Sequence, residues 1–336
     1  KMRSASDMQV FSDSDIVPAE THGSVVALGN FDGVHRGHQA VLGRAKAIAA
    51  KIDAKAGALT FDPHPQLYFR PTTTMFTVSP LPRKLALLDA FGMDFTGVLT
   101  FNQALAGLTA EAFVEQVLVN RLRARHVVVG YNFFFGKGRG GSPHSLERFG
   151  AERGFEVTII EPESDEGDVF SSSSVRDLLR AGNVREAAEA LGHWWAVSGV
   201  VEHGAHLGTG MGYPTVNVML EAGQALHHGI YAARVHAGGK RYDGAAYNGR
   251  RPTFDNGIAK LEVFLFDFSG DLYGSDITVE LIDFIRPDEA FTTAEALVKQ
   301  MDADCAAARD ILAGVKASDP MMRFPIGRKL ATLYEG

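Results

Sequence analysis

The stretch "GNFDGVHRGHQ", residues 29–39, follows a short apolar run, "SVVAL", at residues 24–28. An apolar run of this length predicts a buried strand, and the amphipathic pattern that begins near Gly37 predicts a helix. His35 and His38 therefore flank the place where the helix begins, just beyond the end of a strand. In open sheets of parallel strands, this is the place where ligands bind.

The first half of the chain repeats this alternation of apolar runs and amphipathic segments. Nearly all residues of the runs are apolar, which is typical of strands that are buried on both faces. The pattern predicts a Rossmann-like, doubly wound parallel sheet with helices on both sides. The expected strands are 24–30, 57–61, 95–100, 126–130 and 155–160, and the expected helices are 37–52, 81–91, 109–123 and 142–153.

The pattern changes near residue 190, after one more expected helix at 184–191. Short strand patterns between glycine-rich turns then predict a small antiparallel barrel or sandwich, followed by a helix over 292–313. We expect a first domain at 1–186, a second at 187–313 and a C-terminal tail without clear period at 314–336. The expected strands of the second domain are 194–202, 215–219, 229–236, 241–247, 260–267 and 276–285.

The composition is that of an ordinary globular protein, with 336 residues of which 46% are hydrophobic and 22% charged. The net charge of −7 gives no general attraction to nucleic acid or to an anionic membrane, so we expect neither as a partner. No apolar run approaches the roughly 20 residues that span a bilayer. The single cysteine, Cys305, cannot form an internal disulfide and favours a cytoplasmic location. The sequence leaves self-association open.

The spacing of His35 and His38 is compatible with a phosphate site, a metal site or an exposed surface. A metal site would need a third ligand, and the sequence has no His-Glu-x-x-His pattern. The place after the first strand favours phosphate, because the free N–H groups and the dipole of a helix that begins near Gly37 attract anions. Gly37 has no side chain, so a phosphate can approach the backbone there.

The second half contains a glycine-rich stretch, "HGAHLGTGMGYPTVNV", at residues 203–218. Its glycines suit either a loop around phosphates or a plain flexible hairpin. In the extended segment at its end, Thr215 and Asn217 point to the same face, where their side-chain oxygens suit a nucleotide-bound Mg2+. Glu262 lies on the same face of an expected strand as Phe264, either as a general base or as a carboxylate that faces water.

Three further stretches accompany the histidine motif in the first half: "TFDPHP" at 60–65, "VVVGYNFFFG" at 127–136 and "FSSSSVRDLL" at 170–179. In this order, the four stretches resemble the bacterial bifunctional riboflavin kinase/FMN adenylyltransferase family, the FAD synthetases. Phe170 and Ser173 replace the family's Ile and Thr in the last stretch. The resemblance implies a nucleotidyltransferase domain that converts FMN and ATP to FAD and pyrophosphate.

The resemblance also implies roles for individual residues of the first half. His35 and His38 would contact the ATP phosphates, Asn132 would help to fix the nucleotide, and Arg176 would reach the β- and γ-phosphates. Asp62 and His64 would line the flavin or nucleotide site. The remaining residues that the resemblance places around the nucleotide are Gly29, Phe31, Asp32, Gly37, Ser171, Ser172 and Ser173.

The second half resembles the riboflavin kinase domain, on the stretches "GYPTVN" at 212–217, "GRRPTFDNG" at 249–257, "LEVFLFDF" at 261–268, "DLYG" at 271–274 and "FIRPDEAF" at 284–291. The resemblance implies a six-stranded β-barrel with a C-terminal helix that converts riboflavin and ATP to FMN. Thr215 and Asn217 would bind Mg2+ with ATP, Glu262 would activate the ribityl hydroxyl, and Arg286 would lie near the flavin. Gly204, Gly208, Gly212 and Pro214 would belong to the nucleotide loop.

One departure concerns the glycine loop, where Leu207 and Thr209 replace two arginines that the family usually has. Asn248 likewise stands where a bulky apolar residue is common. We therefore weigh three functions: a bifunctional enzyme that uses ATP, riboflavin and FMN; an FMN adenylyltransferase whose barrel only binds flavin or serves assembly; and a flavin-sensing protein without activity. The magnesium and base residues favour the first, and the intact histidine pair argues against the third.

Overall fold

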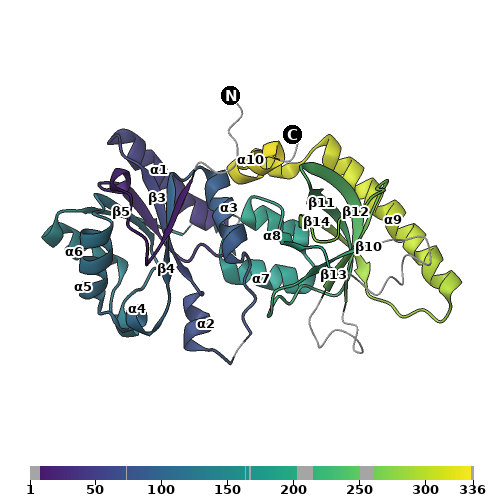
Figure 1. Cartoon of the computed structure of the whole chain (residues 1–336), viewed down its shortest axis with the longest axis horizontal. Coiled ribbons are helices and arrows are strands. Elements are labelled where there is room, and N and C mark those ends of the chain that lie inside the picture. Colours follow the sequence, from purple (N-terminus) through teal and green to yellow (C-terminus); the bar gives the residue numbers. More distant parts are fainter. Residues whose placement is uncertain are drawn as a thin grey trace. The chain divides into compact units, whose positions relative to one another are not determined.

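The computed structural model describes residues 8–72, 74–162, 164–165, 168–202, 215–249 and 260–333. Their contacts divide the chain into two compact units (Figure 1). The first consists of Lys1–Met75 with Ser79–Ser172, and the second of Phe76–Val78 with Ser173–Gly336. The domain limits at 186 and 313 that we expect from the sequence stay predictions.

The first unit is built on a six-stranded sheet in the order β1-β4-β3-β2-β5-β6, in which all neighbours are parallel. This confirms the doubly wound α/β fold. Strand β1 was not expected, because it is a short strand at the edge of the sheet in which Phe11 alone is fully buried. The strands are β1 (Gln9–Ser12), β2 (Val25–Leu28), β3 (Ala56–Asp62), β4 (Phe95–Thr100), β5 (His126–Gly130) and β6 (Glu156–Ile160), with a small hairpin of β7 (Ser164–Asp165) and β8 (Asp168–Val169).

Helices connect these strands, as the alternating pattern predicts. The helix expected at 109–123 is instead a short α-helix that continues as a wider π-helical coil over Val114–Arg121. The helices of the first unit are α1 (Arg36–Lys51), α2 (Pro65–Phe69), α3 (Leu81–Phe91), α4 (Gln103–Gly107), α5 (Ala110–Phe113) and α6 (Pro143–Arg153), with 3-10 turns at Ala19–Thr21 and Lys137–Arg139.

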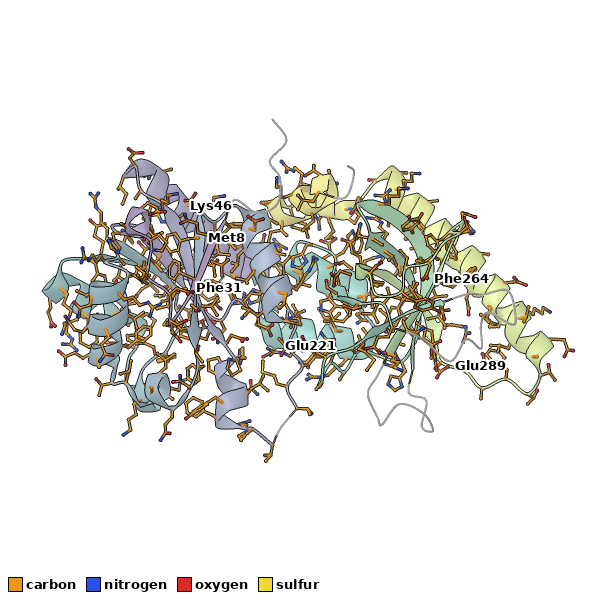
Figure 2. The ribbon with its side chains drawn as sticks, viewed as in Figure 1. Met8, Phe31, Lys46, Glu221, Phe264 and Glu289 are labelled. Atoms are coloured by element: carbon orange, nitrogen blue, oxygen red, sulfur yellow. The ribbon has the colours of Figure 1, made fainter. Side chains whose placement is uncertain are left out.

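Close packing along the sheet explains why its strands are almost entirely apolar. All four residues of β2 are buried, and the aliphatic and aromatic side chains of β2 to β5 form one core with those of α5 and α6. Gly57 in β3 is required by this packing, because a Cβ atom there would lie 2.0 Å from the ring of Phe95. Side chains fill the space between the strands and their helices in both units (Figure 2).

The second unit is a six-stranded antiparallel barrel in the order β10-β13-β12-β11-β14-β9. The two outer strands of this order come together at Glu202, whose backbone N–H donates to the carbonyl of Asn217 at 2.9 Å. The sheet is therefore nearly closed, as a barrel requires. Its strands are β9 (Ala196–Val200), β10 (Thr215–Met219), β11 (Gly229–Ala237), β12 (Lys240–Gly249), β13 (Lys260–Leu265) and β14 (Asp276–Pro287).

The described part of the second unit contains four helices beside the barrel, and they include part of the tail in which the sequence shows no clear period. Helix α9 packs on the outer face of the sheet through Ala308 and Leu312. In the tail, Ile326 and Leu330 are buried, but this single i, i+4 pair is too short to show a helical period in the sequence. The helices are α7 (Ser172–Ala181), α8 (Val184–Leu191), α9 (Ala294–Ala317) and α10 (Pro325–Leu333), with a 3-10 turn at Pro320–Arg323.

Candidate functional site

The histidine motif lies at the point where the strand order of the first sheet reverses. From β2 the chain moves to β3 on one side, and it later returns to place β5 on the other side of β2. The loops that follow β2 and β5 therefore begin side by side, one with the motif and the other with Asn132. Such a switch point at the carboxyl ends of parallel strands is the usual ligand site of this architecture.

The loop between β2 and α1 has an unusual backbone. Phe31, Gly33 and Val34 have positive φ angles of 49°, 84° and 44°. A positive φ is uncommon for Phe and costly for the β-branched Val, so the surrounding structure must hold the loop in this form. Gly29 lies under the ring of Phe31, where a Cβ atom would approach the ring to 3.1 Å.

Hydrogen bonds from three segments fix this loop. The buried carboxylate of Asp32 accepts from the backbone N–H of Ser79 at 2.9 Å, and the N–H of Gly33 donates to the Ser79 hydroxyl at 2.7 Å. The hydroxyl of Ser172 donates to the carbonyl oxygen of Asp32 at 2.8 Å. Asp32, which the sequence suggested as a nucleotide contact, therefore has a clear role in shaping the loop.

The two histidines stack on each other at the start of α1. Their ring centroids are 3.6 Å apart, and Nδ1 of His35 caps the helix by accepting from the backbone N–H of His38 at 3.3 Å. Gly37 fits between them and Phe170, whose carbonyl oxygen would be 3.1 Å from a Cβ atom at this position. Nδ1 of His38 is buried and has no hydrogen-bond partner among the described residues.

The electrostatics of this edge keep His38 neutral. Burial holds the pKa of the His38 imidazole well below its usual value, and the neighbouring side chains of His35, Lys84 and His64 lower it further. Burial also lowers the pKa of the Lys84 ammonium, although the carboxylates of Asp32 and Asp62 act in the opposite direction.

Lys84 was missed by the sequence reasoning. It lies on α3 with the buried residues Leu87 and Leu88, and is itself only 4% exposed. Leu87 and Leu88 follow Lys84 by three and four residues, so all three side chains lie on the same, apolar face of the helix. This spacing in the sequence could have identified Lys84 as a buried lysine.

An aromatic cluster lies at the ends of β3 and β4, next to Asp62. The rings of Tyr68, Phe69 and Phe101 contact one another edge to face, with centroids 5.3–5.6 Å apart. Phe69 is 64% exposed, which is unusual for a phenylalanine and offers a ring surface at this edge. A planar heterocycle can stack on such a surface.

The serine-rich stretch begins helix α7, as its composition suggests, but Arg176 belongs to the second unit. The Arg176 side chain is largely buried, and its Nε donates to the carbonyl oxygen of Phe76 at 2.6 Å. Its expected contact with the nucleotide phosphates stays a prediction. Ser171 and Ser173 flank Ser172 at the helix start.

In the barrel, strand register brings the expected kinase residues together. Asn217 of β10 is paired with Glu262 of β13, which is in turn paired with Tyr247 of β12. Thr215 is two residues from Asn217 and therefore lies on the same face, opposite Phe264. Asn217 is buried, while Thr215 and Glu262 are half-buried. Two side-chain oxygens and a carboxylate thus share one face of neighbouring strands.

The glycine loop that precedes this row lies outside the described residues. This applies to the predicted contacts Gly204, Gly208, Gly212 and Pro214, and to the departures Leu207 and Thr209.

Two other predicted or unusual residues of the barrel have structural partners. Arg286 donates two hydrogen bonds to the carboxylate of Asp304 in α9, from Nε at 2.8 Å and from Nη2 at 2.7 Å. This contact raises the pKa of the guanidinium. Arg286 therefore fastens α9 to β14. The buried Asn248 donates to the carbonyl oxygens of Leu226 and His227 at 2.9 and 3.0 Å, which explains an amide at this position.

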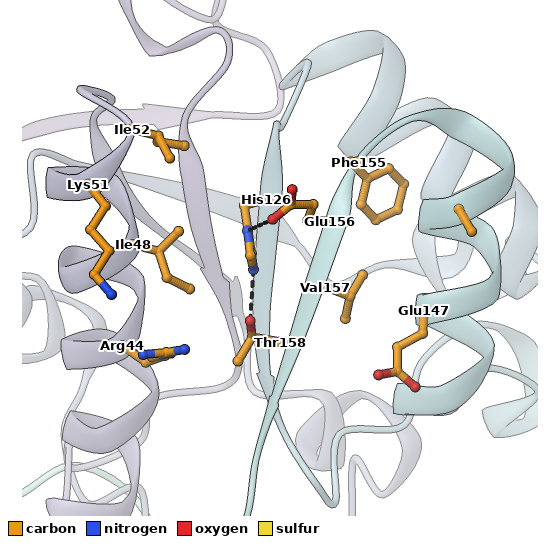
Figure 3. A pocket seen from close by; sticks show the side chains of 11 residues that line it. Arg44, Ile48, Lys51, Ile52, His126, Glu147, Phe155, Glu156, Val157 and Thr158 are labelled. Atoms are coloured by element: carbon orange, nitrogen blue, oxygen red, sulfur yellow. Dashed lines mark hydrogen bonds and ion pairs between the residues drawn. The ribbon is translucent and has the colours of Figure 1, made fainter.

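A separate open pocket lies between α1 and α6, over the beginnings of β5 and β6 (Figure 3). Within it, His126 contacts the carboxylate of Glu156 at 3.0 Å and the hydroxyl of Thr158 at 2.8 Å. None of the residues expected to bind ligands lines this pocket. It is at the other end of the strands from the histidine motif.

Within the described part of the chain, no three His, Cys, Asp or Glu side chains gather in a way that could hold a metal ion. The helices in that same part include none that is long and apolar enough to cross a membrane.

Comparison with known proteins finds two families along the chain. The FAD synthetase family matches residues 17–174, and the riboflavin kinase family matches residues 191–312. The first match covers the histidine motif and strands β2 to β6 of the parallel sheet. The second covers the barrel and most of α9.

Curated relatives match over nearly their whole length. A bifunctional riboflavin kinase/FMN adenylyltransferase of Pseudomonas fluorescens is 38% identical over 295 residues, which cover 88% of this chain and 94% of that protein. The enzyme of the same name from Escherichia coli K12 is 36% identical, with 87% and 94% covered. That of Bacillus subtilis is 32% identical, with 86% and 92% covered.

A solved structure also matches both units of the chain. It is titled as a macrolide-efflux protein from Streptococcus pneumoniae, is 30% identical and has a TM-score of 0.81. The match covers 90% of this chain and 99% of that one.

Proposed function

The chain belongs to the bifunctional riboflavin kinase/FMN adenylyltransferase family, and from this premise we propose which residues carry each reaction. It is an enzyme with two activities, phosphorylation of riboflavin to FMN and adenylylation of FMN to FAD. Because both family matches are present, an adenylyltransferase with an inactive barrel is not favoured.

Adenylyl transfer takes place at the carboxyl edge of the parallel sheet. An oxygen of the FMN phosphate bonds to the α-phosphorus of ATP, while the bond to the bridging oxygen breaks and pyrophosphate leaves with the electron pair. Negative charge on the α-phosphate oxygens is met by His35, His38 and the N-terminus of α1. The observation that carries this assignment is the buried Nδ1 of His38, which has no partner among the described residues.

The other residues of this site bind and orient the substrates. Asn132 lies at the neighbouring strand end and contacts the nucleotide, while Arg176 and the serines at the start of α7 bind the pyrophosphate oxygens. Exposed rings at the end of β3, above all Phe69, stack with the isoalloxazine ring of FMN. Reaction of this kind depends on positioning and on electrostatic stabilisation, without a covalent intermediate on the enzyme.

Riboflavin phosphorylation takes place on the row of residues in the barrel. Glu262 accepts the proton of the ribityl 5'-hydroxyl, so that its oxygen can attack the γ-phosphorus of ATP and ADP can leave. The hydroxyl of Thr215 and the amide oxygen of Asn217 are hard oxygen ligands on one face, and they fit Mg2+ that arrives with ATP. The metal would neutralise phosphate charge during transfer.

The direct test is to incubate the purified protein with ATP, Mg2+ and either riboflavin or FMN, and to separate the flavins by chromatography. We expect FMN and then FAD from riboflavin, and FAD from FMN. FAD from FMN without any FMN from riboflavin would contradict the kinase assignment, and no product from either substrate would contradict both. The cytoplasm, suggested by the single cysteine, is the proposed location of both reactions.

A further inference from the structure

Lys84 is a buried cation that the fold itself does not require. Its Nζ donates to the hydroxyl of Thr60 at 3.4 Å, which is long and is the only hydrogen bond of this ammonium within the described part of the chain. Taking an ammonium out of water costs several kcal/mol unless it is well paired. The carboxylates of Asp32 and Asp62 act on it as nearby charges. Both lie at the reactive edge, Asp32 in the loop after β2 and Asp62 as the last residue of β3.

The position of Lys84 on its helix adds to this cost. It lies in the first turn of α3, where the helix dipole disfavours positive charge. Arg83 beside it is also buried, and its Nη2 has no hydrogen-bond partner among the described residues. The first turn of α3 therefore concentrates positive charge at the edge of the sheet where the histidine motif lies.

A hydrogen-bonded path joins Lys84 to the histidine motif. Lys84 donates to Thr60 in β3, and the Thr60 hydroxyl donates to the carbonyl oxygen of Asn30 at 3.0 Å. Asn30 lies in the loop between β2 and α1, directly before the positive-φ residue Phe31. The lysine thus acts on the loop through one hydroxyl, and on His38 through its charge.

We propose that Lys84 is a positioning residue for adenylyl transfer, which fixes the loop through Thr60 and supplies positive charge behind the histidine pair. This inference rests on the adenylyl-transfer function proposed above. The charge stabilises the extra negative charge on the α-phosphate oxygens as the FMN oxygen bonds to phosphorus and pyrophosphate departs. The ammonium does not bond to the reacting atoms.

The charge of Lys84 also has a defined effect on His38. The titratable groups that act on this imidazole are His35 at the start of its own helix, Lys84 from α3 and His64 before α2, and all three lower its pKa. Removing the lysine charge removes one of these causes, so the pKa of His38 rises. If neutral His38 is the active form, a variant without the lysine charge loses activity on acidification at a higher pH than the wild type does.

The test compares Lys84→Met, Lys84→Gln and Lys84→Arg with the wild type in the FMN-to-FAD reaction. Riboflavin phosphorylation by the same protein serves as the internal measure of the second unit, and thermal unfolding measures the folding of the first unit. We expect kcat for FAD formation to fall about 10- to 100-fold in the Met and Gln variants, with less change in the Michaelis constants. The Arg variant should recover most of the rate, and the acid limb of the Met variant should move to higher pH.

Lys46→Met is the matched control. Lys46 donates to the carbonyl oxygen of Phe91 at the end of α3, so its loss affects the same helix without affecting the reactive edge (Figure 2). This control should lose thermal stability but retain FAD formation.

Two outcomes overturn the inference. One is a Met variant within twofold of the wild type in FAD formation. The other is a loss that matches a fall in stability, with no shift of the acid limb and no recovery in the Arg variant. Wild-type activity on FMN is measured in the same series, so failure of the adenylyl-transfer assignment itself is seen separately.

Discussion

The two candidate sites of this enzyme are built in different ways. The proposed adenylyl-transfer site stands on loops and helix starts beyond the ends of parallel strands, and hydrogen bonds of Asp32, Ser79 and Ser172 hold its main loop. The kinase site stands on the face of antiparallel strands, where register alone aligns Asn217 with Glu262.

The difference predicts how each site responds to substitution. A loop held in an unfavourable backbone form depends on every bond that fixes it, so distant residues should affect adenylyl transfer. A row of side chains on paired strands depends mainly on the residues themselves, because backbone hydrogen bonds keep the register. The following experiments test this contrast.

The largest effect is expected from His38→Ala. The substitution removes an imidazole that stabilises the transferring phosphate and also packs on His35, so FAD formation should fall about 10³-fold. FMN formation should stay near the wild-type rate in the same preparation, as chromatography of the flavins will show. A folded variant that lost both activities would mean that the reactions are assigned to the wrong units.

Glu262→Gln should produce the reverse pattern. The amide cannot accept the proton of the ribityl hydroxyl, so FMN formation should fall about 10²-fold. This is the lower end of the rate effects that general bases usually have, and we expect it because Glu262 is only half-buried. FAD formation from supplied FMN is the control and should not change. Unchanged riboflavin phosphorylation would remove Glu262 from the mechanism.

Ser79→Ala tests whether adenylyl transfer depends on the residues that hold the loop. The change leaves the buried N–H of Gly33 without its acceptor, which should cost about 1–3 kcal/mol of stability and slow FAD formation about tenfold. The exposed Ser198 of the barrel, which contacts the Thr278 hydroxyl, is the matched control, and Ser198→Ala should change neither property. Equal rates for both variants would show that the loop does not need this support.

The smallest effect concerns pH. Since the pKa of His38 is lower in the folded protein than in the unfolded chain, unfolding takes up a proton at pH values below about 6.5. This group therefore contributes stability that is lost as the pH falls from about 6.5 toward the folded-state pKa. Denaturant unfolding at pH 7.5 and about pH 5.5 should show a larger loss for the wild type than for His38→Asn. Equal losses would mean that His38 is not buried as a neutral group.

The sequence predicted much of this molecule, for identifiable physical reasons. Continuous apolar runs mark strands that are buried on both sides, so β2 to β6 were found close to their actual limits. Edge strand β1 and the tail helix α10 have too few buried residues to produce a period. The histidine pair can be recognised as a candidate site because it comes directly after a predicted strand. The network of Ser79, Lys84 and Thr60 cannot, because it depends on contacts between segments that no local pattern encodes.

The C-terminal segment has a consequence for how the protein is made. Buried Arg234 in β11 has its close carboxylate partner in Asp319, at 2.9 Å, and the same carboxylate accepts from the indole N–H of Trp194. A translating ribosome completes all barrel strands at Pro287, well before Asp319 emerges. Until then Arg234 has only the more distant carboxylate of Glu280, at 3.9 Å, among the described residues, and a poorly paired buried charge is costly. The second unit should therefore complete its folding only after Asp319 has been synthesised, whereas the strands of the parallel sheet are all made long before.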